Sequence, residues 1–212
     1  MCDNKIAIIA DSCSDIPKEY IKDNVFIVPI RVIYPDREYY DRVDISPEDV
    51  YSQMPEKVPT TSLPSAESIK EVIDRIVALG YERIISISIS SALSGTFNML
   101  RLIAKEEKRI EISVLDSKNI GIGCGIQIIY ANKLIEEGLP FDEIIEKLNT
   151  SIKQTKVYFS LAGLEYLKKG GRIGKVAAII GSFLRIKPII TCNEDGAYTV
   201  AAKLRGRENS IA

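Results

Sequence analysis

The 212-residue chain contains no histidine. Histidine is the commonest general base at neutral pH and the commonest metal ligand, so its absence removes both from this sequence. A Ser-His-Asp catalytic triad is excluded for the same reason. A ligand-binding function is therefore favoured over a catalytic one, and we expect neither catalytic residues nor a cofactor.

An excess of one charge and long apolar runs are also missing. The 28 Lys and Arg residues nearly balance the 29 Asp and Glu residues, whereas a nucleic-acid-binding surface normally requires an excess of positive charge. No apolar run approaches the ~20 residues of a membrane span. The first residues, Met1-Cys2-Asp3-Asn4, lack the basic and apolar segments of a secretory signal. These absences predict a cytoplasmic protein with no nucleic-acid partner and no membrane span.

Paired cysteines are absent as well. The four cysteines, Cys2, Cys13, Cys124 and Cys192, are scattered, and no two of them form a C-x-x-C pair. Without histidine, a zinc site would require all four to converge. We therefore expect no metal site, and reduced thiols that pack as small hydrophobic side chains.

Strand and helix patterns alternate over residues 1–154. Short β-rich runs are followed by segments whose apolar residues repeat with the helical period. The expected strands are Lys5–Ala10, Val25–Tyr34, Arg83–Ile89 and Glu111–Leu115, and the expected helices are Ser65–Leu79, Thr96–Glu107, one ending at Glu137, and Asp142–Gln154. This order predicts an α/β domain with a mainly parallel sheet and helices on its faces.

The pattern changes near Thr155. Further strands are expected at Val157–Leu161, Lys187–Cys192 and Ala197–Leu204, with helices at Leu164–Lys169 and Lys175–Leu184. The Asp-Gly pair between the last two strands is typical of a hairpin turn and favours antiparallel pairing. We therefore expect a second, α+β domain over residues 155–212, which stops before such a domain is complete.

Two hydroxyl-rich segments are the candidate anion sites. Thr61 and Ser62 precede the helix that starts near Ser65, and Ser94-Gly95-Thr96 follows the strand Arg83–Ile89. Helix starts carry unpaired N–H donors and the positive end of the helix dipole, which favour anions. For any single hydroxyl, helix capping alone is a more frequent role than ligand binding. Binding gains weight because both segments are expected to adjoin elements of one parallel sheet, and ligands bind at the carboxyl ends of such strands.

The segment Lys168-Lys169-Gly170-Gly171-Arg172 has two interpretations of equal weight. Its glycines would end a helix whose lysines complement the helix dipole, or Arg172 could hold a carboxylate or phosphate through paired hydrogen bonds. Other motifs are weaker. Ser94 lacks the flanking glycines of a nucleophile elbow, and Gly121-x-Gly123-x-Gly125 departs from the dinucleotide fingerprint.

Taken together, these segments resemble the DegV family, which includes the fatty-acid-binding subunits of bacterial fatty acid kinase. The matching segments run in family order: Asp11-Ser12 with Asp15, Thr61-Ser62-x-Pro64-Ser65, Ser90-Ser91-x-Leu93-Ser94-Gly95-Thr96, Asp116-Ser117, and Leu164 to Ile173. The resemblance implies a long-chain fatty acid held between an N-terminal α/β domain and a C-terminal domain built on an antiparallel sheet.

The resemblance also implies site residues and a partner. It places the fatty acid carboxylate on Thr61 and Ser94, with Ser62 and Gly95 beside them, and it places Arg172 near the carboxylate when a separate ATP-binding kinase subunit phosphorylates it. The chain would then be a lipid-binding protein that presents substrate rather than an enzyme. The alternatives are a phosphotransferase component related to dihydroxyacetone kinases, which use a histidine that is missing here, and a regulatory interaction module.

Overall fold

The structure is a computed structural model, and it describes residues 5–54, 56–161, 163–176 and 186–205. Its strands are β1 (Ile6–Asp11), β2 (Val25–Val28), β3 (Arg31–Ile33), β4 (Glu38–Tyr40), β5 (Thr60–Ser62), β6 (Arg83–Ser88), β7 (Glu111–Asp116), β8 (Phe159–Ser160), β9 (Ile186–Cys192) and β10 (Tyr198–Arg205). Its α-helices are α1 (Pro47–Gln53), α2 (Ala66–Ala78), α3 (Thr96–Glu106), α4 (Ile122–Glu136), α5 (Phe141–Gln154) and α6 (Glu165–Lys169).

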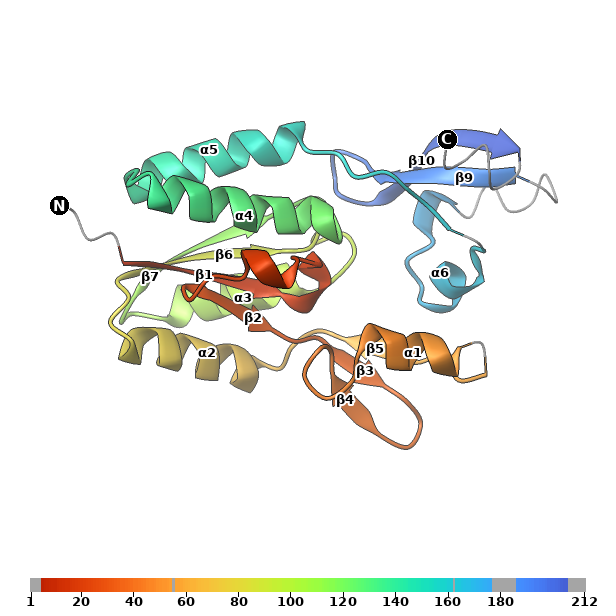
Figure 1. Cartoon of the computed structure of the whole chain (residues 1–212), viewed down its shortest axis with the longest axis horizontal. Coiled ribbons are helices and arrows are strands. Elements are labelled where there is room, and N and C mark those ends of the chain that lie inside the picture. The colour runs from red at the N-terminus through yellow and green to blue at the C-terminus, as the bar shows by residue number, and fades with distance from the viewer. Residues whose placement is uncertain (1–4, 55, 162, 177–185, 206–212) are drawn as a thin grey trace.

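A four-stranded sheet in the order β2-β1-β6-β7 forms the centre of the molecule, and each neighbouring pair in it is parallel. Ile8 of β1 lies opposite Val25 of β2 on one side and Ile85 of β6 on the other. Because the strands are parallel, their carboxyl ends meet at one edge, on the right of the sheet in Figure 1. The predicted fold class, a mainly parallel sheet flanked by helices and accompanied by antiparallel strands, is confirmed.

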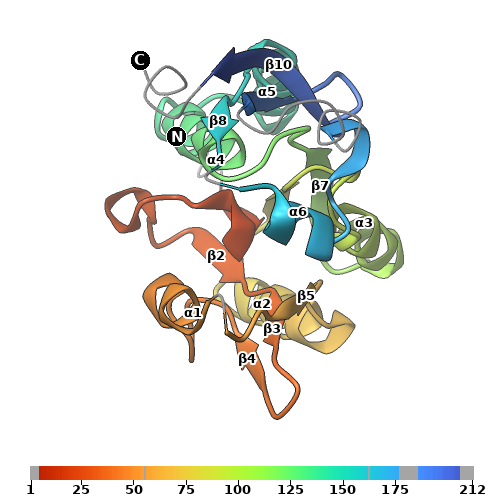
Figure 2. The ribbon, with the colours of Figure 1, turned by 90° about the vertical axis from the view of Figure 1, so that its right-hand side faces the viewer.

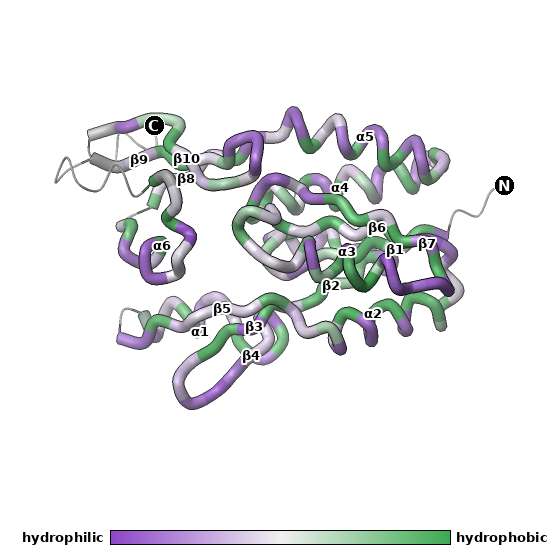
Figure 3. Tube along the Cα trace, turned by 180° about the vertical axis from the view of Figure 1, so that it is seen from behind, coloured by the Kyte–Doolittle hydropathy of each residue, from purple (hydrophilic) through white to green (hydrophobic). Residues whose placement is uncertain are grey.

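Side chains of this sheet fill two hydrophobic clusters, one on each face. Ile8 and Ile85 belong to the cluster packed against α4 and α5, whereas Ile9 and Ile84 belong to the cluster packed against α2 and α3. Successive residues of a strand point to opposite faces, so a strand covered on both sides is apolar at nearly every position. Figure 3 shows β1 as mainly hydrophobic, while α2 and α5 alternate between hydrophobic and hydrophilic residues.

Two three-stranded antiparallel sheets lie at the end of the molecule to which the parallel strands point. One has the order β4-β3-β5, and the other, the C-terminal sheet, has the order β10-β9-β8. Figure 2 faces this end and shows β3, β4 and β5 below β2, with β8 and β10 above it. The predicted antiparallel hairpin is formed by β9 and β10.

Some predicted elements differ from the structure or lie outside it. The run Val25–Tyr34 forms two strands in different sheets, because Pro29 has no N–H to donate and the Ile30 N–H donates instead to Ser12 Oγ (3.2 Å). The helix expected over Lys175–Leu184 lies, after residue 176, outside the described residues. No helix in the described part of the chain is long and apolar enough to cross a bilayer.

Candidate functional site

The first hydroxyl segment, Thr61 and Ser62, lies in β5. This strand pairs with β3 in a small antiparallel sheet, so the expectation that it adjoins the parallel sheet directly is wrong. The β-branched Thr60-Thr61 pair extends the hairpin formed by β3 and β4, which offers an open edge. The capping interpretation is also excluded here, because α2 is capped by Ser65, whose Oγ accepts from the Ser68 N–H (3.1 Å). Thr61 and Ser62 therefore do not serve as the cap of α2.

The second hydroxyl segment, Ser94-Gly95-Thr96, lies at the end of the loop that joins β6 to α3, and Thr96 is the first residue of that helix. The N–H groups of Leu93 and Ser94 both donate to the Ser90 carbonyl, at 2.9 and 3.1 Å. Ser94 Oγ accepts from the Thr96 N–H (3.3 Å) and lies 2.9 Å from Thr96 Oγ1. Gly95 is the N-cap of α3 and has no side chain to satisfy the first N–H groups of the helix. This helix start can accept an anion.

The fold brings these two segments together. A Cβ atom added to Gly95 would lie 3.6 Å from Cδ2 of Leu63, the residue that follows Ser62. This is ordinary van der Waals contact, so the end of β5 and the start of α3 are direct neighbours. The Leu63 side chain thus places the segment of Thr61 and Ser62 next to the start of α3.

Arg172 also reaches the second segment. Its Nε donates to the Leu93 carbonyl (3.2 Å) and its Nη1 to the Gly170 carbonyl (2.7 Å). The side chain is otherwise exposed, and it follows the short helix α6. Figure 1 shows α6 and β5 at the end of the molecule to which the parallel strands point. The structure therefore places Arg172 beside the turn that carries Ser94, and all predicted site residues lie at this end.

Sequence reasoning missed Arg31, which lies opposite Ser62 in the β3–β5 pair. Its Nη2 donates to Ser62 Oγ (3.0 Å), its Nη1 forms an ion pair with Glu38 Oε2 (3.2 Å), and its buried Nε has no hydrogen-bond partner among the residues that the structure describes. A half-buried guanidinium beside a hydroxyl supplies positive charge that favours a nearby carboxylate. The signal was present in the sequence as a lone arginine inside the apolar run Val25–Tyr34.

A buried carboxylate, Asp11, braces the edge of the parallel sheet. It is the last residue of β1, is fully buried, and its two oxygens accept from the N–H groups of Cys13 (3.0 Å) and Ile89 (2.9 Å). Burial raises the pKa of this carboxyl to about 6. The two hydrogen bonds lower the pKa, but their effect is smaller than that of burial. Asp11 ties the end of β1 to the end of β6, directly before the turn that carries Ser94.

The cysteines offer no reactive group in the described part of the chain. Cys13, Cys124 and Cys192 are free, and burial raises the pKa of each thiol. A thiol with a raised pKa is a poor nucleophile and a poor metal ligand at neutral pH. The described residues contain no group of three or more Cys, Asp or Glu side chains that could hold a metal ion.

A cavity of about 670 Å³ lies close to this site. Its apolar lining includes Ile16, Ile27 and Ile45, and Pro29, two residues before Arg31, is part of its wall. Its remaining lining carries five acidic and two basic residues, which are Asp15, Asp41, Asp44, Glu48 and Asp49 with Lys18 and Arg42. This acidic excess disfavours an anionic head group in the cavity. A carboxylate is better accommodated at the hydroxyl segments.

Comparisons with known proteins match nearly the whole chain. A family model described as "Uncharacterised protein, DegV family" matches residues 5–212. A DegV domain-containing protein of Clostridium perfringens is 49% identical over 208 residues, which cover 98% of this chain and 74% of that protein. A second such protein, from Clostridium acetobutylicum, is 43% identical over 208 residues, with the same coverage of both chains.

Solved structures agree with this match. A DegV family protein from Thermus thermophilus, described by its fatty acid binding, is similar with a TM-score of 0.87 at 31% identity, over 97% of this chain and 73% of that one. A stearic acid-binding protein from Eubacterium ventriosum is similar with a TM-score of 0.86 at 32% identity, over 96% and 72% of the two chains. The chain thus spans about three quarters of the length of these relatives.

Proposed function

Because the chain belongs to the DegV family, we propose that it binds a long-chain fatty acid, with the carboxylate held by Thr61, Ser62, Ser94 and Gly95. The observation that carries this proposal is the contact between Gly95 and Leu63, which joins the two hydroxyl segments. The fatty acids bound by the Thermus thermophilus and Eubacterium ventriosum relatives support the ligand class.

The head group is accepted by donors of three kinds. The hydroxyls of Thr61 and Ser94 donate to the carboxylate oxygens, the uncapped N–H groups at the start of α3 add donors, and the Arg31 guanidinium supplies a positive charge beside Ser62. Hydrogen bonds to a charged group contribute about 1.5–3 kcal/mol each. These donors are required, because a carboxylate buried without partners costs on the order of several kcal/mol and would cancel much of the contribution of the tail.

The tail supplies most of the binding free energy. A palmitate chain has about fourteen methylenes, and burying each contributes about 0.8 kcal/mol, or about 11 kcal/mol in total. Loss of free motion on association costs about 4 kcal/mol or more. The difference, about 7 kcal/mol at most, allows tight binding once the hydrogen bonds of the head group are added, so the ligand should remain with the protein through purification. Organic extraction of the purified protein, followed by mass spectrometry, should then release a fatty acid.

Ser94→Ala is expected to weaken palmitate binding by about tenfold or more, because one hydrogen bond to a charged oxygen is lost. Hexadecanol has the same tail and no carboxylate, so its affinity should change far less. Isothermal titration of delipidated protein with both ligands measures the difference. Ser52→Ala, an exposed serine on α1, is the matched control and should leave both affinities unchanged. An unchanged palmitate affinity in Ser94→Ala contradicts the assigned carboxylate site.

We further propose that the bound carboxylate is presented to a separate ATP-binding kinase subunit. In that reaction a carboxylate oxygen attacks the γ-phosphorus of ATP, the bond to ADP breaks, and an acyl phosphate forms. Arg172 supports this role, because its exposed guanidinium is fixed beside the Ser94 turn by the Leu93 carbonyl. There it can stabilise the charge that develops on the transferred phosphoryl group.

Arg172→Ala is expected to keep palmitate affinity within about twofold and to reduce ATP-dependent formation of acyl phosphate by tenfold or more. The measurement is the conversion of protein-bound radiolabelled palmitate in an extract of the source cells, trapped as the hydroxamate. Lys70→Ala, an exposed cation on α2, is the control. If wild-type protein binds palmitate and no ATP-dependent product forms, presentation to a kinase is wrong and fatty acid binding stands.

A further inference from the structure

The turn between β9 and β10 is closed by hydrogen bonds and packs closely against the rest of the molecule. Asn193 closes it with three hydrogen bonds: its N–H donates to the Ala197 carbonyl (2.9 Å), its carbonyl accepts from Gly196 (2.8 Å), and its Oδ1 accepts from the Ala197 N–H (2.9 Å). Gly196 is buried and has a φ of +82°, which favours glycine. We call Asn193–Gly196 the docking turn.

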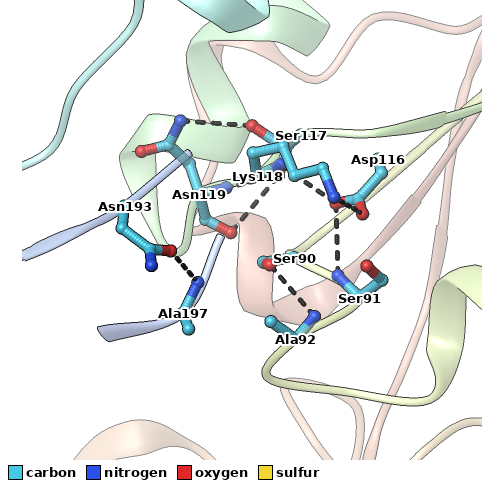
Figure 4. Close-up of polar contacts among 9 residues, drawn as sticks. All are labelled: Ser90, Ser91, Ala92, Asp116, Ser117, Lys118, Asn119, Asn193 and Ala197. Atoms are coloured by element: carbon cyan, nitrogen blue, oxygen red, sulfur yellow. Dashed lines mark hydrogen bonds and ion pairs between the residues drawn. The ribbon is translucent and has the colours of Figure 1, made fainter. Parts of the chain in front are cut away.

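Gly196 has no room for a side chain. A Cβ atom there would lie 2.0 Å from Ser90 Oγ, 2.9 Å from Ser90 Cβ and 3.1 Å from the Lys118 Cα. The hydroxyl could rotate away, but Ser90 Cβ and the Lys118 backbone are fixed. The docking turn of the C-terminal sheet therefore rests directly on the backbone loops that follow β6 and β7, as Figure 4 shows.

Ser90 in turn holds the proposed carboxylate site. Its carbonyl accepts from both Leu93 and Ser94, its Oγ accepts from the Ala92 N–H (3.2 Å), and its own N–H donates to the Asn119 carbonyl (2.8 Å). Figure 4 shows the hydrogen bond from the Ala92 N–H to Ser90 Oγ, with the loop after β7 beside it. Any displacement of Ser90 moves the backbone from which Ser94 Oγ projects.

The same turn is held from a second direction. Leu93 is buried in a hydrophobic cluster whose other buried members, Val176, Ile190, Cys192 and Tyr198, come from the segment after residue 155. The Ser94 turn is thus fixed by Leu93 in the cluster and by Ser90 against Gly196. Both contacts come from the part of the chain that contains the C-terminal sheet, whereas Thr61 and Ser62 are held by β3.

We propose that Gly196 is a positioning residue for the carboxylate site. The docking turn packs against Ser90, and Ser90 holds the backbone of Ser94, so Gly196 determines the position of the Ser94 hydroxyl relative to the end of β5. This inference rests on the proposed fatty acid site. Gly196 itself touches no ligand. Its role is to allow the backbones of the docking turn and of Ser90 to approach closely enough for the Ser94 hydroxyl to meet the carboxylate.

Gly196→Ala is expected to weaken palmitate binding by about tenfold or more, a loss of one hydrogen bond to a charged oxygen, while hexadecanol binding changes little. Gly138→Ala is the matched control, because Gly138 has a φ of +76° and an added Cβ would meet none of the described residues within 4 Å. Both variants carry the same backbone strain, but only Gly196→Ala adds a clash with Ser90, so its thermal unfolding should shift further. Palmitate affinity should fall only in Gly196→Ala.

A compensating variant tests the contact itself. Ser90→Gly in the Gly196→Ala background removes the Oγ and Cβ atoms that the new methyl meets, so most of the lost palmitate affinity should return. Should Gly196→Ala fail to fold, Asn193→Ala, which loosens the docking turn without adding bulk, is expected to show the same selective loss of palmitate.

The outcomes separate the two proposals. If the wild-type chain binds no fatty acid, the proposed function fails. If it binds palmitate and Gly196→Ala, or Asn193→Ala where the first variant is unfolded, binds equally well, the positioning role of the docking turn is overturned. Equal losses of palmitate and hexadecanol would overturn it too, since they indicate a general structural defect.

Discussion

Ile85→Ala is expected to lower the free energy of unfolding by about 2–5 kcal/mol, the range for truncation of a buried isoleucine. Ile85 lies in the middle of β6, is fully buried, and belongs to the cluster that α4 and α5 cover. The neighbouring strands β1 and β7 pair with β6 on both sides. The surrounding side chains therefore cannot collapse into the space that the lost atoms leave.

Urea titration followed by far-ultraviolet circular dichroism measures this loss, because the chain contains no tryptophan to report unfolding. Ile126→Ala is the matched control: Ile126 is 48% exposed on α4, and its truncation should change stability by about 0.5 kcal/mol or less. Equal effects of the two substitutions would contradict the assignment of β6 to the core. Below the unfolding transition, Ile85→Ala should still bind palmitate, since the Ser94 turn is held by other contacts.

The parallel sheet was predictable because its signals are local. The strands β1, β6 and β7 are apolar runs with no competing helical period, and the helices between them repeat their apolar residues every three to four positions. These elements appear within a few residues of the predicted bounds. The hairpin of β9 and β10 was predictable for a similar reason, as its Asp-Gly turn lies between two β-rich runs.

The arrangement of the site was less accessible, because it depends on pairing between distant segments. Thr61 lies in a strand only because β3 and β4 form a hairpin whose edge accepts it. Arg31 is placed beside Ser62 by the register of that sheet, and the closeness of Gly196 to Ser90 arises from the docking of the C-terminal sheet. Residue types identified Thr61 and Ser94 as candidates. Non-local contacts decide what surrounds them.

The last expected effect concerns pH and Asp11. Its pKa is about 6 in the folded protein and 3.8 in an exposed carboxyl, so the folded state binds the proton more tightly than the unfolded state. Stability from this group is therefore fully present below pH 4, is lost as the pH rises to about 6, and then stays constant. At 1.36 kcal/mol per pH unit, the loss is about 3 kcal/mol. Most acidic groups change stability in the opposite direction.

Asp11→Asn isolates this contribution, because asparagine has the shape of the protonated carboxyl and does not titrate. One oxygen cannot serve both the Cys13 and Ile89 N–H groups, so the variant starts with a constant deficit of about 1–3 kcal/mol. Relative to wild type it should gain about 3 kcal/mol between pH 4 and pH 7, measured by urea titration at each pH. A difference that does not vary with pH would mean that Asp11 is hydrated. It could not then be the buried brace between β1 and the turn that carries Ser94.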